Sequence, residues 1–340
     1  MIPESSSVVA SHALPIWQKM LNQAFRDPEA LLNYVQLNDP ARLLAARQAA
    51  KLFPLLVPQG YAARMRKGDP NDPLLRQVLP LAAECETTPG FSNDPVGDLA
   101  AVQQSGILRK YHGRALLIST GACAIHCRYC FRRSFPYNDQ HAAQAQWQHT
   151  LTFLRQHNDI EEVILSGGDP LSLSNQRLAP LLEGLATIPH IKRLRLHSRL
   201  AVVLPERIDT ELLQLIAASG KTHVHVIHAN HANEINHEVV LALRALRNAG
   251  AHLYNQTVLL RGVNDSIDAQ VNLAENLFAH GVQPYYLHLL DRVQGAQHFE
   301  VPEAEALALW QNLQAQLPGY LLPRLVREIP GELSKTWVAR

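Results

Sequence analysis

Three of the four cysteines lie close together at Cys123, Cys127 and Cys130, in a C-x3-C-x2-C spacing. Three thiolates can hold three irons of a 4Fe–4S cluster and leave the fourth iron open to an external ligand. A disulfide framework would instead spread its cysteines along the chain. A structural zinc ion would need a fourth ligand, for which His126 and the distant Cys85 are the candidates. The spacing therefore predicts a cluster with an open iron, and a zinc site or a disulfide is the alternative.

Two further segments could bind a small charged ligand near such a cluster. Gly167 and Gly168 allow a ligand to approach the backbone closely. Asp169 could accept hydrogen bonds from a ligand ammonium, or it could simply cap the turn that follows. Arg132 follows the cysteines and its guanidinium suits a carboxylate, with Arg133 as the less favoured choice.

Six short apolar runs follow one another between long amphipathic stretches. From the second run onward they recur at intervals of roughly 30 residues, which is typical of repeated strand–helix–strand units in a parallel sheet. Helices are expected between them, over 172–187, after Asp209, and from His237 to Asn248 before Gly250. The pattern predicts a partial (β/α)6 barrel, with an open doubly wound sheet as the alternative, and active groups at the carboxyl ends of the strands. The runs lie at 115–119, 162–166, 193–198, 223–228, 252–260 and 284–290.

The pattern of apolar and polar residues divides the chain into three regions. Residues 1–110 are expected to be helical and irregular, 111–300 to form the barrel core, and 301–340 to add a helix and a final segment.

The 340 residues carry a net charge of +1, which gives no indication of a nucleic-acid partner. No apolar run approaches the ~20 residues that cross a bilayer, and the N-terminus lacks a signal pattern, so a cytoplasmic protein is expected.

Several motifs occur in an order that resembles the lysine 2,3-aminomutase family of radical S-adenosylmethionine enzymes. They are CRYCFRR, SGGDPLS, HANHANEI, NQTVLLRGVND, PYYLHLLD and a lysine soon after a Pro-Gly pair, and the resemblance covers 69–335. It implies that the open iron binds S-adenosylmethionine and generates a 5′-deoxyadenosyl radical. It also implies pyridoxal 5′-phosphate (PLP) and the exchange of an amino group with a hydrogen between C2 and C3 of an amino acid.

The resemblance assigns roles to individual residues. Lys335 would hold PLP, although on position alone it could be a solvated lysine. Arg132 would bind the methionyl carboxylate. The segment with Gly167, Gly168 and Asp169 would bind the methionyl amino group. The distal ammonium of L-lysine would be bound by Asp291 and Glu328, where the family has an aspartate at the second position. The remaining PLP-pocket residues would be Arg114, Tyr111, His228 and Gln256.

The resemblance also implies partners and a product. The chain ends soon after Lys335 without the cysteine-bearing extension of larger relatives, so no zinc is expected. The compact form resembles the branch that makes (R)-β-lysine for modifying elongation factor P, with an electron donor such as flavodoxin or ferredoxin and a possible homo-oligomer. The alternatives are an aminomutase for glutamate or arginine, and an iron–sulfur protein without turnover.

Overall fold

The computed structural model describes residues 14–137 and 147–339. Within these residues the strands form one ten-stranded sheet in chain order. Strands β3 to β9 are parallel to one another, while β1 and β2 extend one edge and β10 the other as antiparallel strands. The strands are β1 (Val102–Gln104), β2 (Ile107–Leu108), β3 (Arg114–Thr120), β4 (Glu162–Gly167), β5 (Arg193–Ser198), β6 (Thr222–Ile227), β7 (His252–Val258), β8 (Gln283–His288), β9 (Arg324–Arg327) and β10 (Thr336–Trp337).

The prediction of a parallel α/β sheet is confirmed. All six expected runs are strands β3 to β8, and their neighbours in the sheet are their neighbours in sequence. A doubly wound sheet would reverse its strand order near the middle, so this order excludes the alternative. The structure adds one parallel strand, β9, that the sequence did not predict.

Helices lie between the parallel strands, and α10, α11 and α12 are each capped by the side chain of the preceding residue. Asp209 accepts a hydrogen bond from the Leu212 amide at the start of α10, and Asn236 does the same for Val239 in α11. Gly250 follows α11 with a φ of +85°, which favours glycine. These helices are α7 (Trp147–Gln156), α8 (Asn175–Ala186), α9 (Leu200–Val203), α10 (Thr210–Ala218), α11 (His237–Asn248), α12 (Ile267–Ala279) and α13 (Glu303–Gln316).

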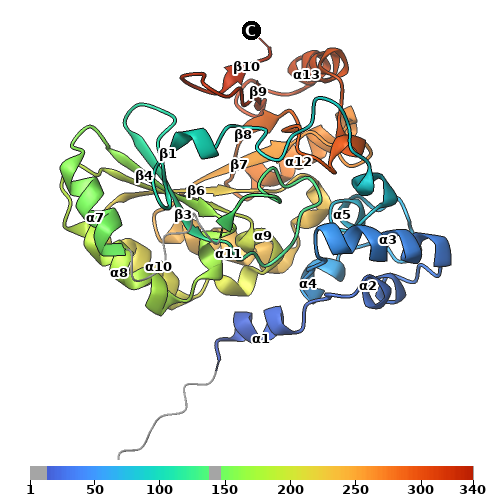
Figure 1. Ribbon diagram of the computed structural model, residues 1–340, viewed down its shortest axis with the longest axis horizontal. Helices are drawn as coiled ribbons and strands as arrows, with labels where there is room; N and C mark the ends of the chain where they lie inside the picture. The colour runs from blue at the N-terminus through green and yellow to red at the C-terminus, as the bar shows by residue number, and fades with distance from the viewer. Residues whose placement is uncertain (1–13, 138–146, 340) are drawn as a thin grey trace, which may run out of the picture.

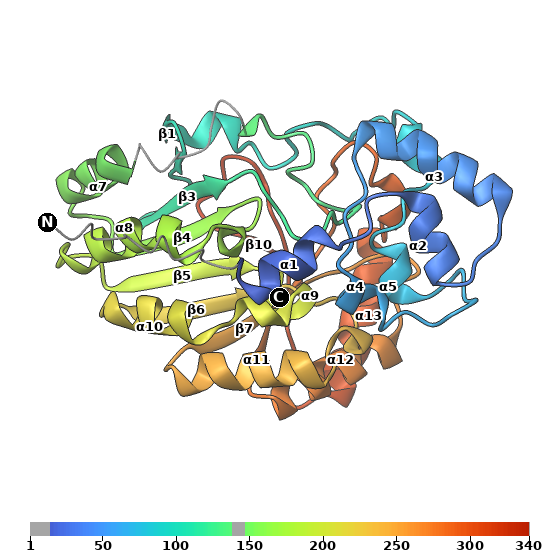
Figure 2. The same ribbon diagram turned by 90° about the horizontal axis from the view of Figure 1, so that it is seen from below.

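The two faces of the sheet differ in polarity. In β5, Leu194 and Leu196 pack into the main hydrophobic core with Leu181 and Leu185 of α8. Helices α7, α8, α10 and α11 follow one another along this outer face (Figure 2). The inner face carries charged and polar side chains, such as an Arg195 guanidinium that donates to the Glu162 carboxylate of β4. A polar inner face is suited to a polar ligand rather than to a dry core.

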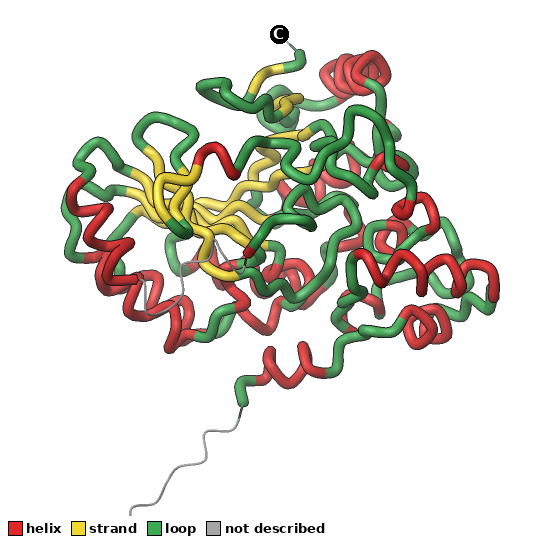
Figure 3. Tube along the Cα trace, in the orientation of Figure 1, coloured by secondary structure: helices red, strands yellow, loops and turns green. Residues whose placement is uncertain are grey.

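Helices α2 to α5 of the N-terminal region lie at one end of the sheet, as Figures 1 and 3 show. Backbone amides of the cysteine segment donate to this region, His126 to the Leu56 carbonyl and Arg128 to the Gln77 carbonyl, both at 2.9 Å. It therefore packs against the carboxyl end of β3. In the described residues, no helix is long and apolar enough to cross a membrane. The N-terminal helices are α1 (Ile16–Asn22), α2 (Pro28–Tyr34), α3 (Pro40–Leu52), α4 (Gln59–Ala62) and α5 (Pro73–Arg76).

Candidate active site

The cysteine segment begins directly after β3 and is held by the glycine pair at the end of β4. The Gly168 amide donates to the Thr120 carbonyl at 2.7 Å, and the Asp169 amide donates to the Ala122 carbonyl at 2.8 Å. A Cβ atom on Gly168 would lie 2.3 Å from the Ala122 oxygen. Gly167 has a φ of +123°, where other residues are strained. The glycines therefore serve first to let the two strand ends approach each other.

The three thiols of this segment influence one another. Burial and the Cys127 thiol raise the pKa of Cys130 to about 11, and burial with Cys130, Asp169 and Cys127 raises the pKa of Cys123 well above its usual value. Such thiols become thiolates when a strongly cationic group joins them. A cluster of several irons meets this requirement.

The fourth ligands considered for zinc do not join the thiols. His126 Nδ1 lies 2.8 Å from the Pro54 carbonyl oxygen and its ring stacks on Phe53, while Cys85 is exposed. Across 14–137 and 147–339, no three His, Cys, Asp or Glu side chains gather closely enough for one metal ion. The donor set fits an iron–sulfur cluster, whose irons accept thiolates that are spread further apart.

Asp169 has the capping role that the sequence left open, and its carboxylate is used within the protein. It accepts hydrogen bonds from the Leu171 amide at 3.0 Å, the Ser198 hydroxyl at 2.8 Å and the Arg199 amide at 2.7 Å. Burial raises its pKa to about 6. This carboxylate thus links the ends of β4 and β5, and its contact with a ligand ammonium stays a prediction.

Arg132 is buried between Ser166, next to the glycine pair, and the acid Asp98. Its Nε donates to Asp98 Oδ2 at 2.6 Å and its Nη1 to Ser166 Oγ at 2.9 Å. Burial alone would raise the pKa of Asp98, but Arg132 and Lys110 lower it below the usual value. Arg133 instead donates to Glu84. The geometry therefore favours Arg132 over Arg133 as the arginine that faces the cluster ligand.

Lys335 lies in the hairpin between β9 and β10 and reaches the inner face of the sheet. Its Nζ donates to Glu328 Oε2 at 2.8 Å and lies 3.1 Å from His288 Nε2. His288 Nδ1 is 2.6 Å from the Leu289 carbonyl, so that nitrogen donates and Nε2 is left to accept. Burial and the charge of Lys335 lower the pKa of His288 to about 3, so the imidazole is neutral. This lysine is held by an anion and a neutral acceptor and is not freely solvated.

Glu328 is the centre of a second set of contacts. The Tyr111 hydroxyl donates to its Oε1 at 2.5 Å, and Lys110 Nζ lies 3.7 Å from the same oxygen. Burial alone would raise the pKa of Glu328, but Lys335 and the hydrogen bonds lower it. The Arg114 guanidinium lies 5.0 Å from the centre of the Tyr111 ring. Four of the predicted site residues are thus linked through Glu328 and Tyr111.

The two remaining PLP-pocket candidates lie on the polar inner side of the sheet. His228 Nε2 is 3.3 Å from His197 Nδ1, and burial with the charges of Arg199 and Lys335 lowers the pKa of His228 to about 4. Gln256 is half-buried in β7 and pairs in register with Tyr286, whose ring centre is 5.8 Å from Lys335 Nζ. Both lie within the neighbourhood of Lys335.

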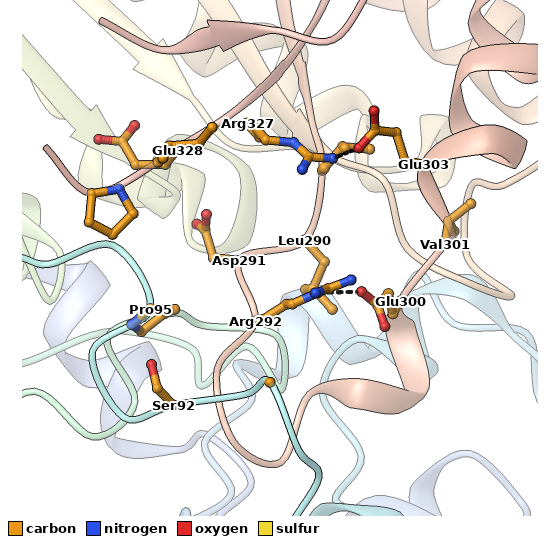
Figure 4. Close-up of a pocket in the computed structure, with 14 residues that line it drawn as sticks. Ser92, Pro95, Leu290, Asp291, Arg292, Glu300, Val301, Glu303, Arg327 and Glu328 are labelled. Atoms are coloured by element: carbon orange, nitrogen blue, oxygen red, sulfur yellow. Dashed lines mark hydrogen bonds and ion pairs between the residues drawn. The ribbon is translucent and has the colours of Figure 1, made fainter. Parts of the chain in front are cut away.

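Asp291 follows β8 and lines a cavity of about 290 Å³ together with Glu328 (Figure 4). Burial raises the pKa of Asp291 to about 7, with Glu328 adding to the effect and Lys335 opposing it. Its Oδ1 is 3.9 Å from His288 Nδ1. Two acids at one cavity form a site for a cationic group.

Three residues of this site were missed from the sequence: Asp98, Lys110 and His288. Lys110 precedes β3 and so lies away from the strand ends where active groups are expected, yet its Nζ is 2.7 Å from Asp98 Oδ1. His288 lies in the motif PYYLHLLD, two residues after Tyr286. Residues two apart in a strand share a face, so this spacing could have placed both on the inner face of the sheet.

Comparisons with known proteins agree with this geometry. The profile of the radical SAM superfamily matches residues 117–273. The chain is 48% identical over 320 residues to L-lysine 2,3-aminomutase of Escherichia coli (strain K12), covering 94% of this chain and 93% of that protein. It is 44% identical over 325 residues to the protein of that name from Haemophilus influenzae, covering 95% of each. The chain is also 32% identical over 321 residues to L-lysine 2,3-aminomutase of Clostridium subterminale, covering 94% of this chain and 77% of that protein.

Among solved structures, a radical SAM methyltransferase from Sphaerobacter thermophilus is similar with a TM-score of 0.44 and 17% identity, covering 65% of this chain and 68% of that one.

Proposed function

Because the chain belongs to the lysine 2,3-aminomutase family of radical S-adenosylmethionine enzymes, we propose that it converts L-lysine to (R)-β-lysine with PLP held at Lys335. Membership of this family implies a 4Fe–4S cluster, S-adenosylmethionine and PLP as cofactors. Cys123, Cys127 and Cys130 are the proposed cluster ligands.

The observation that carries the proposal is the environment of the Lys335 amine. It comes from the end of the chain, yet it contacts Glu328 and His288 and faces the polar inner side of the sheet. An amine must lose a proton before it can attack an aldehyde. Glu328 Oε2 and His288 Nε2 are both within hydrogen-bond reach of this amine, so they hold it in place on the inner side of the sheet.

When bound, the cluster and S-adenosylmethionine supply a carbon radical, and PLP supplies a conjugated ring that delocalises an unpaired electron. The protein's own task is to hold the reacting groups and to exclude water. Arg132, fixed by Asp98 and Ser166, is proposed to orient the methionyl carboxylate. Tyr111 and Arg114 would bind the PLP phosphate, and His228 and Gln256 would line the pocket.

Asp291 and Glu328 support lysine as the substrate. A carboxylate pair attracts a cationic side chain and repels an anionic one, so the site disfavours glutamate. Arginine carries the same charge on a longer and planar group. Since Glu328 also binds Lys335 in this structure, we propose that it is released to the substrate ammonium when Lys335 binds PLP.

The test is anaerobic incubation of the reconstituted enzyme with L-lysine, S-adenosylmethionine, PLP and dithionite, followed by chiral analysis of the products. We expect (R)-β-lysine, and arginine or glutamate should give far less product. Formation of the (S) isomer would contradict the proposed stereochemistry, and turnover of glutamate alone would contradict the substrate.

Lys335→Ala tests the cofactor assignment separately. This variant should lose the visible absorption of bound PLP and all turnover, while its iron content stays at the parent value. Lys221→Ala is a matched control, because Lys221 Nζ contacts the Ile188 carbonyl and precedes β6, at the opposite end of the strand from the site. If Lys335→Ala still formed β-lysine, the assignment would be wrong.

We also propose a cytoplasmic enzyme that receives electrons from a flavodoxin or ferredoxin and whose product modifies elongation factor P. The 48% identity to L-lysine 2,3-aminomutase of Escherichia coli supports the aminomutase activity from which this proposal starts. Reduction of the cluster by purified flavodoxin, followed by optical spectroscopy, tests the electron donor.

A further inference from the structure

Arg199 contacts one of the three cluster cysteines directly. It follows the last residue of β5, and its Nη1 lies 2.7 Å from Cys127 Sγ. The residue is 6% exposed, so the contact is formed away from bulk water. Within the described part of the chain, no arginine or lysine side chain donates to Cys123 or Cys130 in this way.

The guanidinium of Arg199 is held in place by partners other than the thiol. Its Nη2 donates to Glu234 Oε2 at 2.8 Å, to Gln77 Oε1 at 2.7 Å and to the Tyr61 hydroxyl at 3.3 Å. Its backbone amide donates to Asp169 Oδ2 at 2.7 Å. These contacts fix both ends of the side chain and therefore aim Nη1 at the sulfur.

Glu234, the counterion of Arg199, is itself fully satisfied. Its Oε1 accepts hydrogen bonds from the amides of Asn230 and His231, at 2.8 and 3.0 Å, and from Gln77 Nε2 at 3.2 Å. Since the buried positive charge already has a buried partner, its contact with Cys127 is not needed to neutralise it. The stability of the fold thus gives no sufficient reason for aiming Nη1 at a sulfur atom.

A hydrogen bond to a cluster sulfur has a defined electronic effect. The reduced cluster carries one more negative charge than the oxidised cluster, so a donor at the sulfur stabilises the reduced form more strongly and raises the reduction potential. We infer that Arg199 is a positioning residue that orients Cys127 and tunes the reduction potential of the cluster through the Nη1–Sγ contact. This inference rests on the family's cluster and not on the proposed substrate.

The direct test needs no variant. The parent protein is labelled with ¹⁵N-arginine, and its cluster is reduced with dithionite. Lysine, PLP and S-adenosylmethionine are left out of the sample. A pulsed electron paramagnetic resonance spectrum is then recorded. We expect a ¹⁵N coupling from the guanidinium that disappears in Arg199→Lys. A parent spectrum without arginine coupling, or one unchanged in Arg199→Lys, overturns the inference.

The second test measures the midpoint potential of the same samples. In Arg199→Gln we expect the equilibrium constant for reduction to fall about tenfold, which for one electron is ~59 mV. Arg64→Gln is the matched control, because Arg64 donates to the carbonyls of Val202 and Glu234 without contacting a thiol. If Arg199→Gln fails to hold iron, Arg199→Lys keeps a charge beside Glu234 and is used instead. A potential equal to that of the control in either iron-loaded variant overturns the inference, whether or not the enzyme turns over lysine.

Discussion

Asp291 and Glu328 line the same cavity, but their carboxyl groups have opposite pKa shifts (Figure 4). Glu328 receives hydrogen bonds from Lys335 and Tyr111 that outweigh the effect of burial. Asp291 lacks such direct donors among the described residues, so burial dominates and its pKa rises to about 7. Of these two acids, Glu328 is therefore ionised at neutral pH and Asp291 ionises near neutrality.

The first prediction concerns the pH dependence of substrate binding. Asp291 is protonated below about pH 7 and becomes a carboxylate above it, so attraction for a cationic substrate should grow as pH rises. We expect the KM for L-lysine to fall several-fold between pH 6 and 8. The measurement is an initial-rate series across that range. In Asp291→Asn the KM should be higher and flat with pH, and a KM that still falls in this variant would assign the ionisation to another group.

The second prediction concerns the close approach of the glycine pair to the cysteine segment. Gly168→Ala would place a methyl group against the Ala122 carbonyl, 2.3 Å from its oxygen, and we expect a cost of ~1–3 kcal/mol and a loss of iron binding. Iron per chain and urea unfolding measure both effects. Gly60→Ala is the control, because Gly60 lies in α4 with nothing within 4 Å of the added Cβ. Equal iron binding in the two variants would contradict the proposed tight fit.

The third prediction concerns the buried acid that joins the N-terminal region to the cysteine segment. Glu84 accepts hydrogen bonds from Arg128 Nε at 2.9 Å and Arg133 Nη2 at 2.8 Å. Glu84→Ala leaves two buried guanidinium groups without their anion, so the free energy of unfolding should fall by ~3–5 kcal/mol. Denaturant unfolding checks this value. Glu29→Ala, which breaks an exposed pair with Arg47, should cost less than ~1 kcal/mol. A similar small loss for Glu84→Ala would show that this cluster contributes little.

The fourth prediction concerns the hydrogen bond between Tyr111 and Glu328. Tyr111→Phe removes a donor to a carboxylate and should lower the free energy of unfolding by ~1–3 kcal/mol at pH 7. The pKa of folded Glu328 is below its usual 4.5, so the stability that it contributes is present above pH 4.5 and is lost only as pH falls through the folded pKa. Urea unfolding of both proteins at pH 8, 6 and 4.5 should therefore give a constant difference. If the difference in unfolding free energy between the two proteins already shrinks between pH 8 and 6, a group other than Glu328 causes the pH dependence.

Strands β3 to β8 were predictable because their short apolar runs alternate with amphipathic stretches and, from the second run onward, recur at regular intervals. The exception is β9, where Leu325 and Val326 are flanked by Arg324 and Arg327 and the run is too short to be recognised. This strand is a parallel neighbour of β8 and leads directly to Glu328. Sequence periodicity misses such a strand because its pairing partner, and not its own composition, determines it.

The cysteines and Lys335 could be proposed from the sequence, but several of their contacts could not. Asp98, Lys110 and Glu328 come from three separate segments, and only the folded chain brings them within ion-pair distance. The contacts of Asp169 show the same limit, since its glycine-rich motif predicts a ligand contact but not the strand to which Asp169 is linked. Its carboxylate accepts hydrogen bonds from Ser198 and Arg199, which belong to the next strand and its end.

The place of Lys335 after β9 has a consequence for biosynthesis. A ribosome completes the cysteine segment while most of the sheet is still to be translated, but it makes Lys335 only after β8 and β9. Domains fold as their sequence emerges. A chain interrupted midway would thus carry the proposed iron ligands and lack the proposed PLP lysine. The order of the sequence acts as a safeguard, because the proposed radical-generating residues cannot be joined to the proposed PLP lysine until β9 has been translated.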